Sequence, residues 1–268
     1  MLPANHSLSS MYDIHSNNII VFTARNAIVD IHYHMCYQIV VSTQTPFDCT
    51  IDGHTHSQIK GLLINQKITH LCQALHTDVL VFLIDAESLV GWQIKEMLSG
   101  QPFLDIESIL APQQLTDFLS ACGQAASPDE MRKVSDSLLE QLFSLQTLKT
   151  NRPMDDRMVK ILEYIEANRQ DPMILDDIAK LVFLSPERTR HLFAQETGIP
   201  FSQYLLWKRI KAVLTQVIGK NAPMIDAILE NGFSDQPHFT HLFKRTFGVS
   251  AKLLLKNSRS VQFLKPML

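Results

Sequence analysis

Two short stretches of the sequence decide the fold: TRHLFAQETG (residues 189–198) and FTHLFKRTFG (residues 239–248). Each places His-Leu-Phe five residues before a glycine, and the second copy follows the first by fifty residues. A phrase that recurs at a fixed spacing indicates that one small structural unit has been built twice. The residues on either side of each copy show which unit this is.

Each copy follows a shorter helical pattern, ILDDIAKLV in the first case and MIDAILENG in the second, and then a break. Ser185 and Asp235 come after the break and suit a helix start, because their side-chain oxygens accept from the free amides of a new first turn. Thr189, Leu192 and Phe193 then recur at helical spacing. Two short helices across a tight turn predict a helix-turn-helix whose second helix enters a major groove.

The segment between the copies, PFSQYLLWKRIKAVLTQVI (residues 200–218), has the apolar spacing of one long helix. About 18 helical residues span roughly 27 Å. A rigid spacer of that length is suited to holding two recognition helices about 34 Å, or one turn of DNA, apart. The repeat therefore predicts one chain that reads two successive major grooves on one face of a duplex.

These segments resemble the AraC/XylS family of bacterial transcription regulators over about residues 157–256. The resemblance rests on DDIAKLVFLS, HLFAQETGIPFSQYL, KRIKAVL and, above all, ENGFSDQPHFTHLFKRTFGVS. It implies a cytoplasmic bacterial regulator that binds double-stranded DNA, forms a homodimer, has RNA polymerase as a further candidate partner, and has no membrane partner. It also implies a cupin-like effector domain in the N-terminal half.

The resemblance also implies which side chains contact DNA. The base-reading positions fall at Glu187, Arg190, His191, Gln236, Pro237, Thr240 and His241, and the phosphate contacts at Arg188, Lys208, Lys244 and Arg245. Arginine pairs well with guanine, glutamine with adenine, and glutamate accepts from the amino group of cytosine. Phosphate contacts orient a protein on DNA without specifying sequence. Phe183 departs from the family pattern, in which a small turn residue is usual at this position.

The charge distribution agrees with this assignment. Residues 152–268 contain 17 Lys and Arg against 12 Asp and Glu, whereas residues 1–151 contain 7 against 15. A basic half joined to an acidic half indicates that the second half meets the polyanion. The four cysteines have no close pairing along the chain, which is typical of a reducing compartment. The composition, with 46% hydrophobic and 19% charged residues, is that of a globular protein.

The N-terminal half contains short β patterns. IVDIHYHMCYQIVVS (residues 28–42) alternates, and FDCTIDG, GLLINQKITHLCQA and DVLVFLID follow, with turns predicted at Asp52-Gly53 and Thr77-Asp78. Strands of this length without helices between them predict a small antiparallel barrel or sandwich. The expected fold is therefore a two-domain α+β protein. Residues 1–150 form the effector and dimerisation domain (barrel about 1–87, helices about 88–150), and residues 151–268 form the all-α DNA-binding domain.

Three histidines and one glutamine of this half form the candidate effector site: His32, His34, Gln38 and His70. Imidazoles two residues apart on one strand face are able to converge on one metal ion. Cupin enzymes use a similar pattern with a glutamate where this chain has Gln38, so the anionic ligand is missing. A metal site, an organic effector touching this face, and purely structural histidines all remain open. We expect no cofactor beyond a small-molecule effector.

A candidate dimer helix follows. In SPDEMRKVSDSLLEQLFSLQTLK (residues 127–149), an apolar stripe with steps of three and four comprises Met131, Val134, Leu138, Leu142 and Leu145. The stripe fits either a seam between two protomers or a helix packed on its own domain. We expect the seam.

No nucleophile elbow, phosphate-binding glycine loop or paired-acid site stands out, so we expect no enzymatic activity. The alternative is a metal-dependent cupin enzyme with an attached DNA-binding domain. It requires His32, His34 and His70 to hold the metal.

Overall fold

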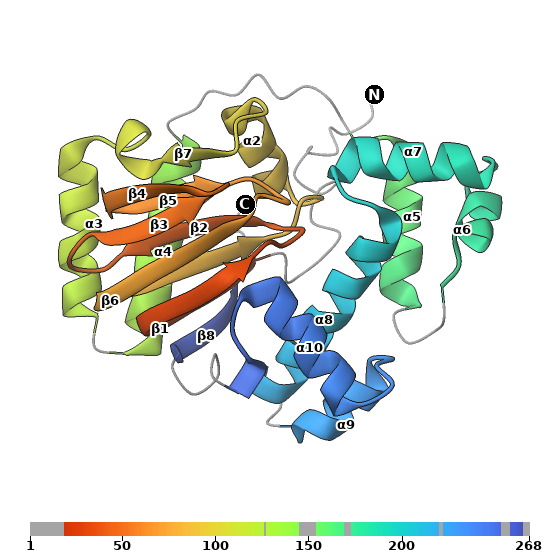
Figure 1. The fold of residues 1–268 in the computed structure, drawn as a ribbon. Coiled ribbons are helices and arrows are strands. Elements are labelled where there is room, and N and C mark those ends of the chain that lie inside the picture. Colours follow the sequence, from red (N-terminus) through yellow and green to blue (C-terminus); the bar gives the residue numbers. More distant parts are fainter. Residues whose placement is uncertain are drawn as a thin grey trace, which may run out of the picture.

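The computed structural model describes residues 19–125, 127–144, 154–168, 173–219, 222–252 and 258–264. It has the predicted two-part α+β architecture, an antiparallel sheet with its own helices beside a helical part (Figure 1). The strands are β1 (Ile19–His32), β2 (Tyr37–Ser42), β3 (Phe47–Ile51), β4 (His54–Ile59), β5 (Gly61–Ile64), β6 (His70–Ile84), β7 (Phe103–Asp105) and β8 (Ser258–Leu264). The helices are α2 (Leu89–Leu98), the 3-10 turn η1 (Ile106–Ser108), α3 (Pro112–Gln124), α4 (Pro128–Ser144), α5 (Asp156–Ala167), α6 (Leu175–Leu181), α7 (Pro186–Thr197), α8 (Phe201–Gly219), α9 (Met224–Glu230) and α10 (Gln236–Phe247).

The long strand β6 organises the sheet. It pairs with β1 along one edge, and along the other it pairs first with β3 and then with β2. The remaining strands extend the sheet in the order β4-β3-β6-β2-β5-β7, and β8 joins on the outer side of β1. All of these pairings are antiparallel. This barrel-like sheet confirms the predicted fold class.

Two local predictions within the sheet are wrong. The turn predicted at Thr77-Asp78 does not form, because β6 runs through these residues and the irregularity lies instead in its register with β1. The single strand expected over residues 28–42 is two strands, β1 and β2, separated at residues 33–36. The turn at Asp52-Gly53 is confirmed, with positive φ angles of 46° and 81°.

The sheet buries apolar side chains on both faces. One face, including Ile39, Leu63 and Phe82, packs under α2, α3 and α4. The opposite face, including Val40 and Leu62, joins the side chains of α8, α9 and α10 in one continuous buried cluster. The helical C-terminal half is thus packed directly against the sheet (Figure 1).

The first and last described strands, β1 and β8, pair in the sheet. β8 comes from the C-terminal tail, and Phe263 and Val261 pair with Ile20 and Phe22 of β1 (Figure 1). The last strand of the N-terminal sheet is therefore supplied from the other end of the chain. The division into domains at about residue 150 stays a prediction, with the qualification that β8 belongs to the sheet.

All four cysteines are buried and free. Cys49 and Cys72 are opposite each other on β3 and β6, and their Sγ atoms lie 3.3 Å apart. The pKa of the Cys72 thiol is raised well above its usual value by this hydrogen bond and by burial. The two cysteines lie 23 positions apart in the chain, so only strand pairing brings them together.

In the part of the chain that the structure describes, no helix combines the length and the apolar character needed to span a lipid bilayer.

Candidate nucleic-acid interface and effector site

The first recognition helix, α7, starts as predicted. The Ser185 side chain accepts from the backbone N–H of Arg188 at 3.3 Å, and Pro186 occupies the first turn, where its missing N–H costs nothing. Thr189 and Phe193 are buried and hold the helix on its neighbours. The side chains predicted to contact DNA are exposed: Glu187, Arg188, Arg190 and His191.

Three of these side chains are linked on the surface of α7. The Glu187 carboxylate accepts from Arg190 through one oxygen, and its other oxygen lies 2.9 Å from Nε2 of His191. Surface pairs of this kind contribute little stability. In this structure they orient the Arg190 guanidinium along the surface of α7.

The second recognition helix, α10, repeats the arrangement. The Asp235 carboxylate accepts from the backbone N–H of His238 at 2.7 Å, and this bond, with one from Ser234, lowers the pKa of Asp235. Phe239 and Phe243 are fully buried. The predicted DNA-contacting side chains of this helix are also exposed: Gln236, Pro237, Thr240, His241 and Lys244.

The turn between α6 and α7 contains a strained residue. Phe183 has φ of 54° and its side chain is 94% exposed, whereas the matching turn of the second unit has Gly232 at φ of 78°. Left-handed φ costs a non-glycine residue roughly 1–2 kcal/mol. Glycine loses about 0.5–1 kcal/mol more conformational freedom on folding. Phe183→Gly should therefore raise the free energy of unfolding by about 0.5–1 kcal/mol in urea titrations.

Phe183→Ala is the matched control for this variant. It removes the exposed ring and keeps a Cβ in the strained conformation, so it should not stabilise the protein. Equal stabilisation by both variants would assign the effect to the ring and contradict the backbone explanation.

The predicted spacer helix is confirmed as α8, whose 19 residues span about 28 Å between the two helix-turn-helix units. Its inner face is anchored to the loop that follows β6. Asp85 accepts from Nε1 of Trp207 at 2.6 Å and from Nζ of Lys211 at 2.5 Å. Glu87 accepts from the Tyr204 hydroxyl at 2.8 Å.

Lys208 joins the same cluster, since its Nζ lies 3.0 Å from Glu87 and 3.4 Å from Asp85. Its side chain is only 12% exposed, so Lys208 is not available as a phosphate contact, contrary to the prediction. Burial alone would raise the pKa of Asp85, but Lys211 and Lys208 lower it below its usual value. Burial lowers the pKa of Lys211, against the opposing effect of Asp85. The carboxylate is thus held ionised between two cations.

Each recognition helix ends in a glycine that touches the N-terminal half. Gly198 closes α7 with φ of 76°, and its carbonyl accepts from Nζ of Lys67 at 2.7 Å. Gly248 closes α10 with φ of 67°, and its carbonyl accepts from the backbone N–H of Asp30 at 3.2 Å. Lys244, one turn earlier, pairs with the Asp30 carboxylate at 3.2 Å. The repeated glycines are therefore docking points as well as helix ends.

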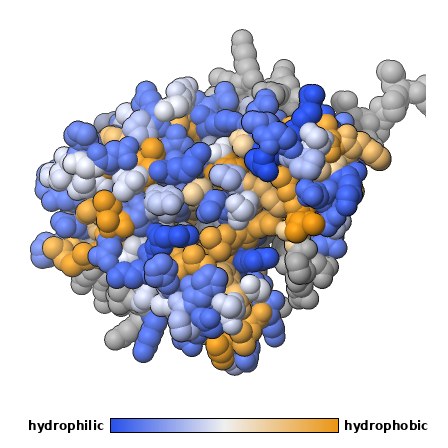
Figure 2. Space-filling model, turned by 45° about the vertical axis from the view of Figure 1, so that its right-hand side comes forward, coloured by the Kyte–Doolittle hydropathy of each residue, from blue (hydrophilic) through white to orange (hydrophobic). Residues whose placement is uncertain are grey.

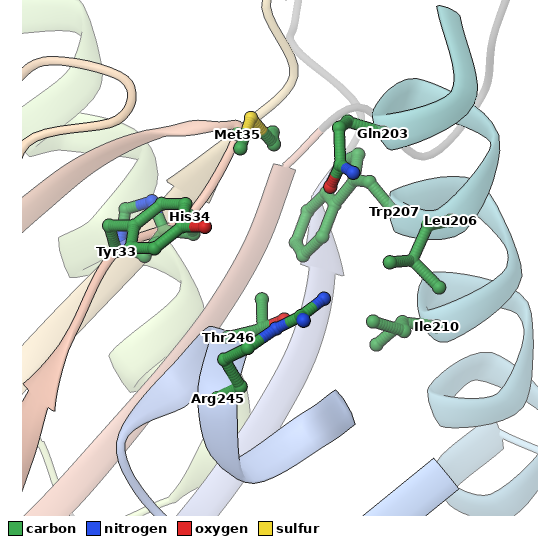
Figure 3. Close-up of a pocket in the computed structure, with 9 residues that line it drawn as sticks. All are labelled: Tyr33, His34, Met35, Gln203, Leu206, Trp207, Ile210, Arg245 and Thr246. Atoms are coloured by element: carbon green, nitrogen blue, oxygen red, sulfur yellow. The ribbon is translucent and has the colours of Figure 1, made fainter. Parts of the chain in front are cut away.

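A pocket lies where the loop between β1 and β2, α8 and α10 meet (Figure 3). It is lined by Tyr33, His34, Met35, Gln203, Leu206, Trp207, Ile210, Arg245 and Thr246. The wall from α8 is mostly apolar, Tyr33, His34 and Met35 lie opposite it, and Arg245 from α10 extends into the space between them. On the face of the molecule that carries these helices, apolar side chains gather in a band between hydrophilic regions (Figure 2).

The candidate effector residues His32, His34, Gln38 and His70 are brought together and are buried. The ring centroids of His32 and His70 lie 4.2 Å apart, and those of His34 and His70 lie 5.0 Å apart. Oε1 of Gln38 is 2.7 Å from Nε2 of His34 and 3.4 Å from Nε2 of His70. His34 alone among the four also lines the pocket.

Burial favours the neutral form of all three imidazoles by lowering the pKa of each. Burial and the neighbouring His34 lower the pKa of His32 to about 3, against hydrogen bonds to the backbone of Asp30 and His70 that raise it. Burial lowers the pKa of His34. It also holds the pKa of His70 well below the usual value, with His34 and His32 adding to the effect.

The predicted dimer stripe on α4 lies mostly inside the protomer. Leu138 and Leu142 are buried in the core under the sheet, and Met131 and Val134 are partly buried against it. Leu145 lies outside the described residues. In this structure the stripe packs on its own domain, which was the alternative to a seam between protomers.

Sequence reasoning did not find the residues that join the two halves. Asp85, Glu87, Asp30 and Gln66 carried no motif. The signal present in the sequence is the pair Lys208 and Lys211, three apart on a helix that is otherwise apolar on that side. Basic residues on the buried side of a helix require a carboxylate partner. The sequence alone does not say where that partner lies.

Comparison with known proteins is consistent with these observations. Residues 178–257 match a helix-turn-helix domain family. The regulatory protein PocR of Salmonella typhimurium is 24% identical over 69% of this chain and 70% of its own length. The activator AarP of Providencia stuartii is 30% identical over 35% of this chain and 70% of its own length. The arabinose operon regulatory protein of Escherichia coli K12 is 31% identical, and the chain spans 41% of its length.

The fold as a whole resembles ToxT from Vibrio cholerae, with a TM-score of 0.54 at 14% identity over 92% of this chain and 100% of that one. A ToxT structure with bound unsaturated fatty acid gives a TM-score of 0.51 at 12% identity, over 91% of this chain and 98% of that one. At this identity the likeness concerns the fold alone. The repeated helix-turn-helix, the barrel-like sheet and these relatives together place the chain in the AraC/XylS family of DNA-binding transcription regulators.

Proposed function

We propose that this regulator reads two adjacent major grooves, with α7 in one and α10 in the next, and that a small molecule between its two halves controls it. The observation that carries the proposal is the equivalence of the two helices. Both start at a side-chain cap, expose a polar face, and end in a left-handed glycine, and α8 joins the two units. Helices presented in this way are suited to major-groove entry.

Base reading is assigned to Arg190 and Glu187 in the first unit and to Gln236 and Thr240 in the second. Arg190 is suited to a bidentate contact with guanine, and Gln236 to one with adenine. His191, Pro237 and His241 lie on the same exposed faces. Arg188 and Lys244 are assigned to phosphates, and Lys244 must leave Asp30 to reach one.

Arg190→Ala tests the base assignment. The variant should bind the selected operator about 1–3 kcal/mol more weakly, with little change on random DNA, because a base contact discriminates and a phosphate contact does not. Fluorescence anisotropy on a duplex selected by the protein from a randomised pool measures both affinities. Arg157→Ala, an exposed arginine of α5 paired with Asp155, is the matched control and should bind as the wild type does.

Equal losses on the operator and on random DNA would assign Arg190 to a phosphate. If the wild-type protein binds no DNA at all, the proposed function itself is overturned.

The pocket between the sheet, α8 and α10 is the proposed effector site. Its apolar wall, including Leu206 and Ile210, and the guanidinium of Arg245 suit a small molecule with an apolar body and a carboxylate. The fatty acid bound by ToxT, which shares the fold, has this chemistry. The ligand would act on transcription only by binding one arrangement of the two halves more tightly than another.

Thermal shift measurements with an unsaturated fatty acid test the effector site. Saturating ligand should stabilise the wild type, by about 2.7 kcal/mol at a hundred times the dissociation constant, and should stabilise Arg245→Ala much less. Arg188→Ala has the same net charge as Arg245→Ala, and the ligand should stabilise it as much as it stabilises the wild type. A shift that is the same in both variants would place the carboxylate elsewhere.

We infer that the protein acts in the bacterial cytoplasm, where its DNA is, and as a regulator rather than an enzyme. Dimerisation through α4 would rely on the partly exposed Met131 and Val134, since Leu138 and Leu142 are already buried. A double variant with Met131→Ser and Val134→Ser should dissociate the dimer in sedimentation experiments if this surface forms the dimer interface.

A further inference from the structure

We propose that His32, His34 and His70 form a binding site for one divalent first-row transition-metal ion, with the Gln38 side-chain oxygen as an additional donor. Each histidine offers a ring nitrogen, and the three atoms lie within 4.8 Å of one another. The histidines come from the end of β1, the loop after it and the start of β6, so the sheet itself assembles the cluster.

The outer nitrogens of the three rings are already occupied. Nδ1 of His32 lies 2.9 Å from the carbonyl of Asp30, Nδ1 of His34 lies 2.9 Å from the carbonyl of Cys36, and Nδ1 of His70 lies 2.8 Å from that of Ile68. A carbonyl only accepts, so each Nδ1 carries the proton. In a neutral ring Nε2 then has no proton and presents a lone pair. Backbone bonds of this kind orient histidines that ligate metals.

The centre of the cluster therefore holds several acceptors facing one another. Nε2 of His34 and Oε1 of Gln38 lie 2.7 Å apart, and Nε2 of His70 approaches the same oxygen at 3.4 Å. Two lone pairs at this distance repel unless a cation lies between them or the Gln38 amide turns over to donate. A metal ion accepts a lone pair from each of these nitrogen and oxygen atoms at once. The turned amide, by contrast, has only two N–H hydrogens to offer the three rings.

The donor set selects the class of ion. Neutral imidazoles suit Zn²⁺, Ni²⁺, Co²⁺, Fe²⁺ and Cu²⁺, whereas Mg²⁺ and Ca²⁺ require oxygen ligands. Three histidines with a fourth position for another donor are an established zinc arrangement. Nitrogens at about 2.1 Å from a tetrahedral ion are roughly 3.4 Å apart, so the rings need to close by up to about 1.4 Å from their 4.8 Å limit.

The pocket touches the histidine cluster at one residue, His34. The three side chains are nearly fully buried, at 7%, 2% and 1% exposure for His32, His34 and His70. His34 nevertheless forms part of the wall of the pocket between the sheet and α8 (Figure 3). An ion entering from the pocket would therefore approach the cluster from the His34 side.

Metal binding would also affect how both recognition helices, α7 and α10, are held. This inference rests on the proposed function. His34 accepts through its carbonyl from the backbone N–H of Lys67, whose side chain holds the end of α7. His32 lies two residues from Asp30, which holds the end of α10 and pairs with Lys244. An ion that holds these two segments in place stabilises the arrangement in which α7 and α10 are docked on the N-terminal half. In that arrangement Lys244 pairs with Asp30 instead of with DNA.

The test uses the full-length protein without a histidine tag, stripped with a chelator and then titrated with Co²⁺ and Zn²⁺. One ion per chain should remain after desalting, and bound Co²⁺ should show the visible absorption of a site with nitrogen ligands. His34→Gln and His70→Gln should weaken binding at least a hundredfold. Wild-type protein that takes up no ion, or uptake that both variants retain, would overturn the site.

Two further variants protect this test against misfolding. Gln38→Glu supplies the missing anionic donor and should bind Zn²⁺ at least tenfold more tightly, and equal or weaker binding by a folded variant would count against the site. His54→Ala removes an exposed histidine of β4 and should leave stoichiometry and affinity unchanged. If His54→Ala abolishes uptake, the ion lies elsewhere.

The coupling to DNA has its own measurement. Metal-loaded protein should bind a duplex selected from a randomised pool about fivefold more weakly than stripped protein, and His34→Gln should show no difference. Equal affinities with the ion bound would overturn the coupling and leave the site standing. Failure of the stripped protein to bind any DNA would overturn the proposed function instead.

Discussion

Replacing Asp85 with alanine is expected to lower the free energy of unfolding by about 3–5 kcal/mol. The variant leaves the Lys211 ammonium buried, with its 2.5 Å partner gone, and also removes the acceptor of the Trp207 indole. Removing one member of a buried pair is costly because the remaining charge keeps its desolvation penalty. Lys211 limits the loss by giving up its proton, since burial already lowers its pKa.

Urea titrations followed by tryptophan fluorescence measure this loss. Asp177→Ala is the matched control, because Asp177 pairs with Lys180 at 3.2 Å on the exposed side of α6 and should contribute less than about 1 kcal/mol. Asp85→Asn combined with Lys211→Met removes both charges and should recover most of the stability. A double variant as unstable as Asp85→Ala would show that packing, and not the unpaired charge, sets the cost.

Gly248→Ala is expected to detach α10 from the sheet. A Cβ at this position would lie 2.3 Å from the carbonyl oxygen of Asp30, which is backbone, and 2.9 Å from Nδ1 of His32. The residue also has φ of 67°, so alanine adds the left-handed cost of roughly 1–2 kcal/mol. Because backbone cannot yield as a flexible side chain can, we expect the contact between the two halves to open.

Two other glycines make this prediction specific. Gly100 has φ of 82° and nothing within 4 Å, so Gly100→Ala should cost only the backbone term. At Gly198 the obstacle is the end of the Gln66 side chain at 2.5 Å, which is able to move at the cost of its hydrogen bonds to the carbonyls of Met35 and Thr197. The expected order of destabilisation is therefore Gly248, then Gly198, then Gly100.

Hydrogen exchange gives a second measurement of the same event. The Asp30 amide, which donates to the Gly248 carbonyl, should lose protection in Gly248→Ala and keep it in Gly100→Ala. Protection that survives in Gly248→Ala would show that the two halves remain docked.

The helix-turn-helix units could be predicted because their signals are local. The Ser185 and Asp235 caps, the helical spacing of Thr189, Leu192 and Phe193, and the length of α8 depend on residues within a few turns of one another. The exposed polar faces of α7 and α10 follow from the same periodicity. Where the local signal was ambiguous, as at Thr77-Asp78, the pairing of β6 with β1 overrode it.

The candidate site was only partly predictable. Alternation along one stretch placed His32, His34 and Gln38 on one face, but their burial, the approach of His70 and the direction of each Nδ1 depend on strand pairing. The apolar stripe on α4 showed the helical spacing of the side chains that are buried, but not the surface that covers them. An apolar stripe states that a helix buries one face, and only the fold states whether the same protomer covers it.

By itself the sequence determined the class of protein: a repeated, capped helix pair on a long spacer, joined to an acidic β-rich half. Only the tertiary structure decided how the two halves meet. Asp85 reaches Lys211 across 126 positions, Gly248 meets Asp30, and the tail strand β8 closes on β1. These contacts join residues that share no local pattern, because burial and charge neutralisation act on distances in space and not on distances along the chain.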